Sequence, residues 1–123
     1  MLKNLLLVMI GGGTGSGLRF LTYHYCSRYF VGNFPVATFI CNILGCIAIG
    51  VLSGWIARTA GGDSAMKWLL VTGFCGGYTT FSAFGIENFG LLQGNNIMTA
   101  IAYIAASVCF GILAVGLGLA IAR

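Results

Sequence analysis

Apolar residues dominate the chain in four long stretches, at about residues 3–26, 36–57, 67–90 and 97–121. Each stretch is long enough for the roughly 20 helical residues that cross a hydrocarbon core of about 30 Å. None of them alternates steadily between polar and apolar positions, and so few strands could not close a membrane barrel. No polar mature domain follows the first stretch, so we do not expect a cleaved signal peptide. The pattern predicts an all-α membrane protein, a single domain over residues 1–123 with four transmembrane helices.

Short polar segments separate the four stretches. The segment "SRYFVGNFP" holds the only proline, Pro35, and a proline is tolerated at the start of a helix. The segment "RTAGGDS" offers Asp63 and Ser64 as caps for the third helix. The segment "LQGNN" divides the last two helices, and these divisions leave no room for a second domain.

The composition agrees with a lipid environment. Hydrophobic residues make up 59% of the chain and charged residues 7%, whereas a soluble domain carries about a quarter charged residues. The basic residues are scattered and form no patch for nucleic acid, so we expect them to set membrane topology instead. Four spans place Lys3, Arg58, Lys67 and Arg123 on one side and Arg28 on the other, which favours cytoplasmic termini.

Cysteine and glycine are both frequent, but neither follows a metal or phosphate motif. The five cysteines include no Cys-x-x-Cys pair, and the single His24 has no partner motif, so we expect the cysteines to act as packing residues. The run "GGGTGSGLR" lacks the Lys-Ser/Thr of a phosphate loop. Its glycines at 11 and 15, and at 13 and 17, are four apart, which favours close approach of a neighbouring helix backbone.

Two polar side chains in the first two stretches, Arg19 and Asn42, each allow two interpretations. Arg19 at membrane depth would cost at least about 2.5 kcal/mol, so it either faces a cavity or partner, or extends to the membrane surface from near a helix end. Thr38 and Asn42 are four apart and share a helical face. The amide of Asn42 either clasps another helix or lines a pore.

The fourth stretch carries a line of hydroxyl groups. Thr99, Tyr103 and Ser107 follow one another at intervals of four residues. Such hydroxyls can bond to carbonyls of their own helix. Two polar lines on two helices nevertheless favour a polar route across the bilayer.

The third stretch is interrupted by "GFCGGYTTFSAF" at residues 73–84. Gly76 and Gly77 each lower helix stability by roughly 1 kcal/mol relative to alanine, and the β-branched Thr79 and Thr80 add little support. A helix broken at membrane depth frees backbone carbonyls, and such breaks hold ions in channels and transporters. Phe81 and Phe84 then share a face, and the positive edges of phenyl rings favour an anion. The segment therefore predicts an ion site at a broken helix.

These segments resemble a known family. "GFCGGYTTFSAF" is closely similar to the third-helix signature of the Fluc (CrcB) family of fluoride channels, and "GGGTGSGLRF" and "CNILGCIAIG" resemble its first- and second-helix patterns. The resemblance covers the whole chain. Ala83 departs from it, since the family often has threonine at this position, and one hydroxyl is therefore missing.

The resemblance implies a multi-pass protein of the bacterial inner membrane that assembles as an antiparallel, dual-topology homodimer. It implies passive export of fluoride, which reduces cytoplasmic fluoride toxicity, through two pores beside a central structural sodium ion. Backbone carbonyls of Gly76 and Thr79 would hold the sodium, Arg19 would lie at an aqueous vestibule, and Thr80 and Glu87 would belong to a polar track. The residues implied for the fluoride pore are Thr38, Asn42, Phe81, Ser82, Phe84, Tyr103 and Ser107.

Three other classes of protein fit the sequence less well. A proton-coupled multidrug exporter needs a membrane-embedded carboxylate, whereas Asp63 and Glu87 lie near the ends of their segments. A non-transporting structural subunit would leave the polar lines without a purpose. No nucleophile, base and orienting group recur at a plausible spacing, so we expect neither an enzyme nor catalytic residues.

Overall fold

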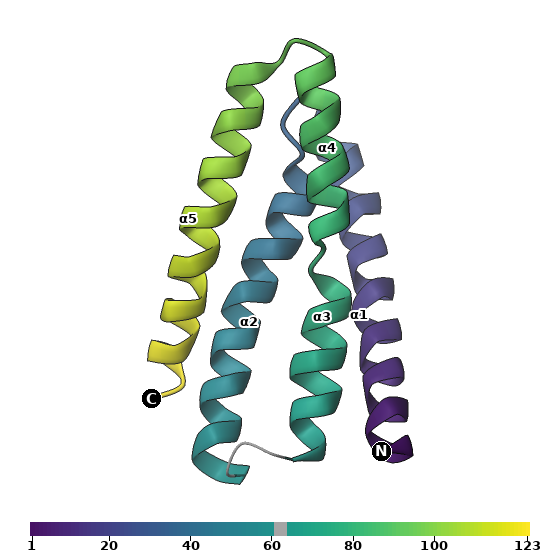
Figure 1. Cartoon of the computed structure of the whole chain (residues 1–123), viewed down its shortest axis with the longest axis vertical. Helices are drawn as coiled ribbons and strands as arrows, with labels where there is room; N and C mark the ends of the chain where they lie inside the picture. The colour runs from purple at the N-terminus through teal and green to yellow at the C-terminus, as the bar shows by residue number, and fades with distance from the viewer. Residues whose placement is uncertain (61–63) are drawn as a thin grey trace.

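The computed structural model describes residues 1–60 and 64–123, which form a bundle of long helices (Figure 1). Four helical spans are long and apolar enough to cross a membrane, and the third of them is interrupted. The prediction of an all-α membrane protein with a broken third helix is therefore confirmed. The elements are α1 (Leu2–Tyr29), α2 (Val36–Ala60), η1 (Lys67–Cys75), α3 (Gly76–Tyr78), α4 (Phe81–Gln93) and α5 (Ile97–Ile121).

Local sequence explains where the helices begin and end. α2 begins directly after Pro35, whose carbonyl accepts a hydrogen bond from the N–H of Phe39 at 3.1 Å. α1 continues to Tyr29, past the predicted end at residue 26. The chain then turns at Gly32, whose φ of +148° is one that glycine adopts readily and other residues rarely do. Between α4 and α5, Asn95 adopts a left-handed φ of 61°, which asparagine tolerates better than most residues.

The start of the third span differs from the expected capping. The N–H of Lys67 bonds to the backbone carbonyl of Ser64 at 3.1 Å. The Ser64 hydroxyl itself is buried without a hydrogen-bond partner among the described residues, so its predicted role as a side-chain cap is wrong. Asp63, the other expected cap, lies outside the described residues.

The helices pack in two close pairings. α2 lies along α5, and α1 lies along η1 and α3 (Figure 1). Both termini lie toward one end of the bundle, and the α1–α2 and α4–α5 connections lie at the other end. These two connections are joined by a hydrogen bond from Asn33 Nδ2 to Asn96 Oδ1 at 3.3 Å. The third span thus lies between α1 and α2, which are the helices that can bond to its break.

Glycine allows α1 to approach the third span closely. Gly11 and Gly15 are buried, and a Cβ atom added at either one would collide with the backbone of η1. This confirms the first of the two predicted glycine pairs. For the second pair, a Cβ added at Gly13 or Gly17 would meet no atom of the described chain within 4 Å. Only the face that carries Gly11 and Gly15 therefore makes the contact within the subunit.

We expect Gly15→Ala to destabilise the fold. The added methyl group would overlap the carbonyl of Phe74, and overpacking of this kind costs about 1–3 kcal/mol. The measurement is the thermal unfolding midpoint of the detergent-solubilised protein. The matched control is Gly13→Ala on the same helix, which has free space and gains helix propensity, so its midpoint should stay level or rise. Equal midpoints for the two variants would contradict this account of the packing.

Candidate functional site

The interruption of the third span lies at Thr79 and Thr80. Both residues are extended, with φ and ψ of −83° and 155° at Thr79 and of −149° and 125° at Thr80. Gly76 and Gly77, the weakest helix formers of the segment, still belong to α3. The Thr80 hydroxyl caps α4 by accepting the N–H of Ala83 at 3.2 Å. The helix therefore breaks after its glycines, where extended threonines can start a new helix.

Asn42 on α2 clasps the backbone of the break. Its Oδ1 accepts the N–H of Thr80 at 2.8 Å, and its Nδ2 donates to the carbonyl of Thr80 at 3.1 Å. One side chain thus bonds to both polar backbone groups of Thr80, whose N–H has no helical acceptor at the break. The helix–helix clasp is therefore present in the structure. The pore-lining role of Asn42 stays a prediction.

The break also leaves two carbonyls without their helical donors. In a continuous α-helix, Gly76 would accept from the N–H of Thr80, and Thr79 would accept from the N–H of Ala83. Those two N–H groups bond instead to Asn42 Oδ1 and to the Thr80 hydroxyl. Gly76 is exposed, and a Cβ added there would meet nothing within 4 Å. The carbonyls named in the sodium prediction are thus among those that the break releases.

A third carbonyl at the break, that of Gly77, is held by α1. The Nε of Arg19 donates to it at 3.1 Å, and the hydroxyl of Ser16 donates to it at 3.4 Å. Arg19 is half-buried. Its side chain therefore turns toward a partner inside the bundle, which favours the partner-bonded interpretation over extension to the membrane surface.

A carboxylate joins four helices by hydrogen bonds. Glu87 on α4 accepts from the Thr38 hydroxyl of α2 at 2.7 Å and from the Tyr103 hydroxyl of α5 at 2.9 Å. The hydroxyl of Tyr23 on α1 is hydrogen-bonded to Thr38. Thr38 and Tyr103 are fully buried. The polar lines predicted on the second and fourth spans thus meet at Glu87.

The two phenylalanines of the segment lie in different surroundings. Their ring centroids are 5.6 Å apart. Phe84 packs against the cluster of Leu91, Ala100 and Tyr103, with its ring 5.0 Å from that of Tyr103. Phe81 is 82% exposed, so it is largely uncovered by the described chain. Core packing thus accounts for Phe84 but not for Phe81.

Two serines of the predicted track differ in their hydrogen bonding. Ser82 is exposed, and its hydroxyl bonds to the Thr80 hydroxyl at 3.1 Å. The Ser107 hydroxyl oxygen, one turn beyond Tyr103 on α5, is buried and has no hydrogen-bond partner among the described residues. A buried hydroxyl without a partner is costly, so Ser107 is the member of the line with bonding capacity to spare.

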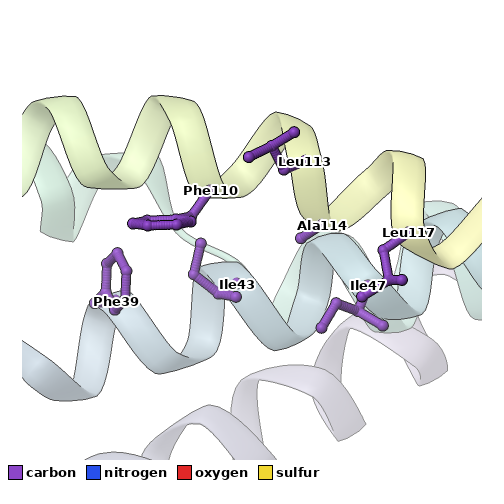
Figure 2. A pocket seen from close by; sticks show the side chains of 7 residues that line it. All are labelled: Phe39, Ile43, Ile47, Phe110, Leu113, Ala114 and Leu117. Carbon is purple, nitrogen blue, oxygen red and sulfur yellow. The ribbon is translucent and has the colours of Figure 1, made fainter.

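Two grooves on the described surface contrast in their chemistry. The larger, of about 500 Å³, lies between α2 and α5 and is lined only by apolar side chains such as Phe39, Ile43 and Phe110 (Figure 2). It has no hydrogen-bonding side chain to offer an ion. The second groove, of about 270 Å³, lies against the break. It is lined by Asn42, Gly45, Cys46, Ile49, Thr79, Thr80 and Phe81.

Side chains suited to a metal ion are not gathered anywhere in the described parts of the chain. Residues 1–60 and 64–123 contain no cluster of three or more His, Cys, Asp or Glu residues. All five cysteines are free thiols, and Cys41 and Cys75 are buried. A cation bound near the break would therefore need oxygens of the backbone or of neutral side chains.

Several residues at the site were not predicted from the sequence. Ser16, Thr22 and Tyr23 lie on α1 beside Arg19, and the hydroxyl of Thr22 is hydrogen-bonded to that of Tyr78 at 3.0 Å. Positions 16, 19, 22 and 23 are spaced three or four residues apart around one face of a helix. That spacing was a signal available in the sequence.

Four spanning helices, with a third that is broken and clasped by its neighbours, define a small multi-pass membrane protein. The model of one family, described as CrcB-like protein, Camphor Resistance (CrcB), matches residues 6–119. The chain belongs to this family.

Similar curated proteins come from several bacteria. A protein of Flavobacterium psychrophilum is 45% identical over 122 residues, covering 99% of this chain and 98% of its own. Proteins of Azobacteroides pseudotrichonymphae and Phocaeicola vulgatus are 45% and 44% identical, and each match covers 96% of this chain. The matches cover 94% and 97% of those two proteins. Each of the three is named fluoride-specific ion channel FluC.

Proposed function

We propose that this chain forms a fluoride-selective channel that releases fluoride passively across the cell membrane and so lowers fluoride toxicity in the cytoplasm. One observation carries the proposal. Neutral donors and two phenyl rings gather at a break in the third span, in a chain similar along its whole length to proteins named as fluoride channels. A bacterial inner membrane is the setting that fits these relatives.

Fluoride is small and strongly hydrated, so its path must replace water with many weak donors and avoid a single strong trap. The described donors are of this kind. Asn42 supplies an amide, and Ser82 and Ser107 supply hydroxyls, of which Ser107 has no partner within the described chain. Thr38 and Tyr103 continue the path to Glu87, to which both donate. Thr80 belongs to the same track through its bond to Ser82.

Phenyl edges supply the remaining contacts of the proposed path. The edge of a phenyl ring is positive and its face negative, so an edge turned to the ion favours an anion. Phe81 lines the groove beside the break and is 82% exposed, which leaves its ring free to face an ion or a second subunit. Phe84 lies between Phe81 and Tyr103, so its ring bridges the groove and the hydroxyl line.

The assembly we propose is an antiparallel homodimer around a structural sodium ion. The carbonyls of Gly76 and Thr79 from both copies would hold the ion, and broken helices offer carbonyls to sodium in this way. Two observations support this placement. The N–H groups that would bond to these carbonyls in a continuous helix bond to side chains, and the surface at Gly76 is open. Bound sodium would offset the partial negative charge of carbonyls that meet at the centre. Arg19 would lie at the base of an aqueous vestibule.

Flux from liposomes tests the function directly. Purified protein in liposomes should release fluoride far faster than chloride under an imposed membrane potential, because the donor path suits a small and strongly hydrated anion. Ion-selective electrodes measure both fluxes, and protein-free liposomes give the baseline. Equal fluxes of the two anions would overturn the proposed selectivity.

We expect Phe81→Ile and Phe84→Ile each to lower fluoride flux by about tenfold or more, which corresponds to about 1.4 kcal/mol in the barrier. Isoleucine keeps apolar bulk but has no positive ring edge. The same liposome assay measures the loss, and size-exclusion chromatography checks that the dimer stays intact. Phe89→Ile is the matched control, since Phe89 lies on the same helix and is exposed at 62%, away from both the groove and the hydroxyl line. Normal flux in both test variants would remove the ring-edge role.

An experimental structure determined in sodium should show density at the centre of the dimer. We expect carbonyl oxygens of Gly76 and Thr79 at about 2.3–2.6 Å from it, the range for a hard cation bound by oxygen. Crystals grown with sodium replaced by a large organic cation should lose that density. Oxygen distances near 2.8 Å, which are typical of a water, would count against sodium.

A further inference from the structure

The Gly77 carbonyl receives two hydrogen bonds from α1, and it lies where the third span is interrupted. In an unbroken α-helix this carbonyl would accept from the N–H of Phe81. Arg19 Nε and the Ser16 hydroxyl donate hydrogen bonds to this carbonyl instead, at 3.1 Å and 3.4 Å. Both contacts therefore compete with the bond that would close the break, and they stabilise the broken form.

Close packing of α1 on α3 is what brings Arg19 to this carbonyl. A Cβ added at Gly77 would collide with the backbone of Gly12, so the two backbones already touch. Arg19 lies seven residues, or two helical turns, beyond Gly12 and on the same face of α1. The planar guanidinium has a fixed donor direction, so a bond from Nε also fixes the orientation of the Gly77 peptide.

Neighbouring contacts hold the residues on both sides of the break. The hydroxyl of Tyr78 is bonded to that of Thr22 on α1 at 3.0 Å, and Asn42 on α2 holds both backbone groups of Thr80. Thr79 lies between them. Its carbonyl direction, and the starting direction of α4 with its two phenyl rings, are therefore set by contacts with α1 and α2.

We infer that Arg19 is a positioning residue: it acts through the Gly77 peptide to keep the third span broken in the shape that exposes the carbonyls and aims the rings. This inference rests on the proposed channel function and gives Arg19 a second role besides the effect of its charge. A vestibule cation that only attracts anions works through its charge and is screened by salt. A positioning residue works through the geometry of its donor, which salt does not change.

Arg19→Lys separates these two roles, because lysine keeps the charge and loses the guanidinium geometry. We expect the ratio of fluoride to chloride flux to fall by about tenfold or more, since small displacements of a site have effects of at least this size. The fall should be the same at ionic strengths of about 0.01 M and about 1 M, between which the Debye length shrinks from about 30 to about 3 Å. The flux ratio is used because a smaller number of folded channels would not alter it.

The matched control is Arg28→Lys on the same helix, since Arg28 is exposed and bonds only to His24 among the described residues. Its flux ratio should equal that of the unaltered protein. A normal ratio in Arg19→Lys, or a loss that disappears at high salt, would overturn the inference and leave the channel function intact. An unaltered protein without fluoride selectivity would instead overturn the proposed function.

A second variant keeps the inference testable if Arg19→Lys fails to assemble by size-exclusion chromatography. Ser16→Ala removes only the longer of the two bonds to Gly77. We expect the flux ratio to fall in the same direction by about two- to fivefold, the effect of one weak hydrogen bond. An unchanged ratio in Ser16→Ala would then overturn the inference.

Discussion

Backbone polar groups within a bilayer must be bonded inside the protein, and this constraint governs the third span. Ending α3 at Tyr78 and starting α4 at Phe81 frees several peptide groups at membrane depth. Each N–H that the break releases at Thr80 and Ala83 finds a side-chain oxygen. The break persists because other helices supply these partners, and the chain around it is arranged to bring them close.

The neighbouring helices serve the break in different ways. α2 contributes one amide, Asn42, that satisfies both backbone groups of Thr80. α1 contributes a face of glycines that lets its backbone touch the third span, followed by Ser16 and Arg19, which bond to the Gly77 carbonyl. The polar residues of α1 thus depend on its small residues, because the polar side chains reach the break only where the glycines allow the two backbones to touch.

The sequence was sufficient to predict the spans, because about 20 apolar residues leave little choice except a helix that crosses the membrane. It also predicted a break within residues 73–84 from weak helix formers, but propensity does not show that the helix runs through Gly76 and Gly77 and stops at Thr79 and Thr80, where an asparagine on another helix stabilises the interruption. Tyr23 and Thr22 were missed for a related reason. Their spacing from Arg19 placed them on one face of a helix, but their partners, Thr38 and Tyr78, lie on other elements, and only the fold brings them together.

Glu87 raises a question about any anion path along the hydroxyl line, because a carboxylate repels an anion. Thr38 has a single hydroxyl proton and directs it to Glu87, so the proton between Tyr23 and Thr38 must come from Tyr23. Tyr103 also directs its proton to Glu87. Two hydroxyls, those of Thr38 and Tyr103, therefore donate to the same acceptor, Glu87. On the proposed path, an anion would have to replace the carboxylate as the acceptor of these two hydrogen bonds, and only a strong hydrogen-bond acceptor could do so. Fluoride, which concentrates its charge on a small ion, meets this requirement better than chloride. The carboxylate that repels anions in general would then help to choose among them.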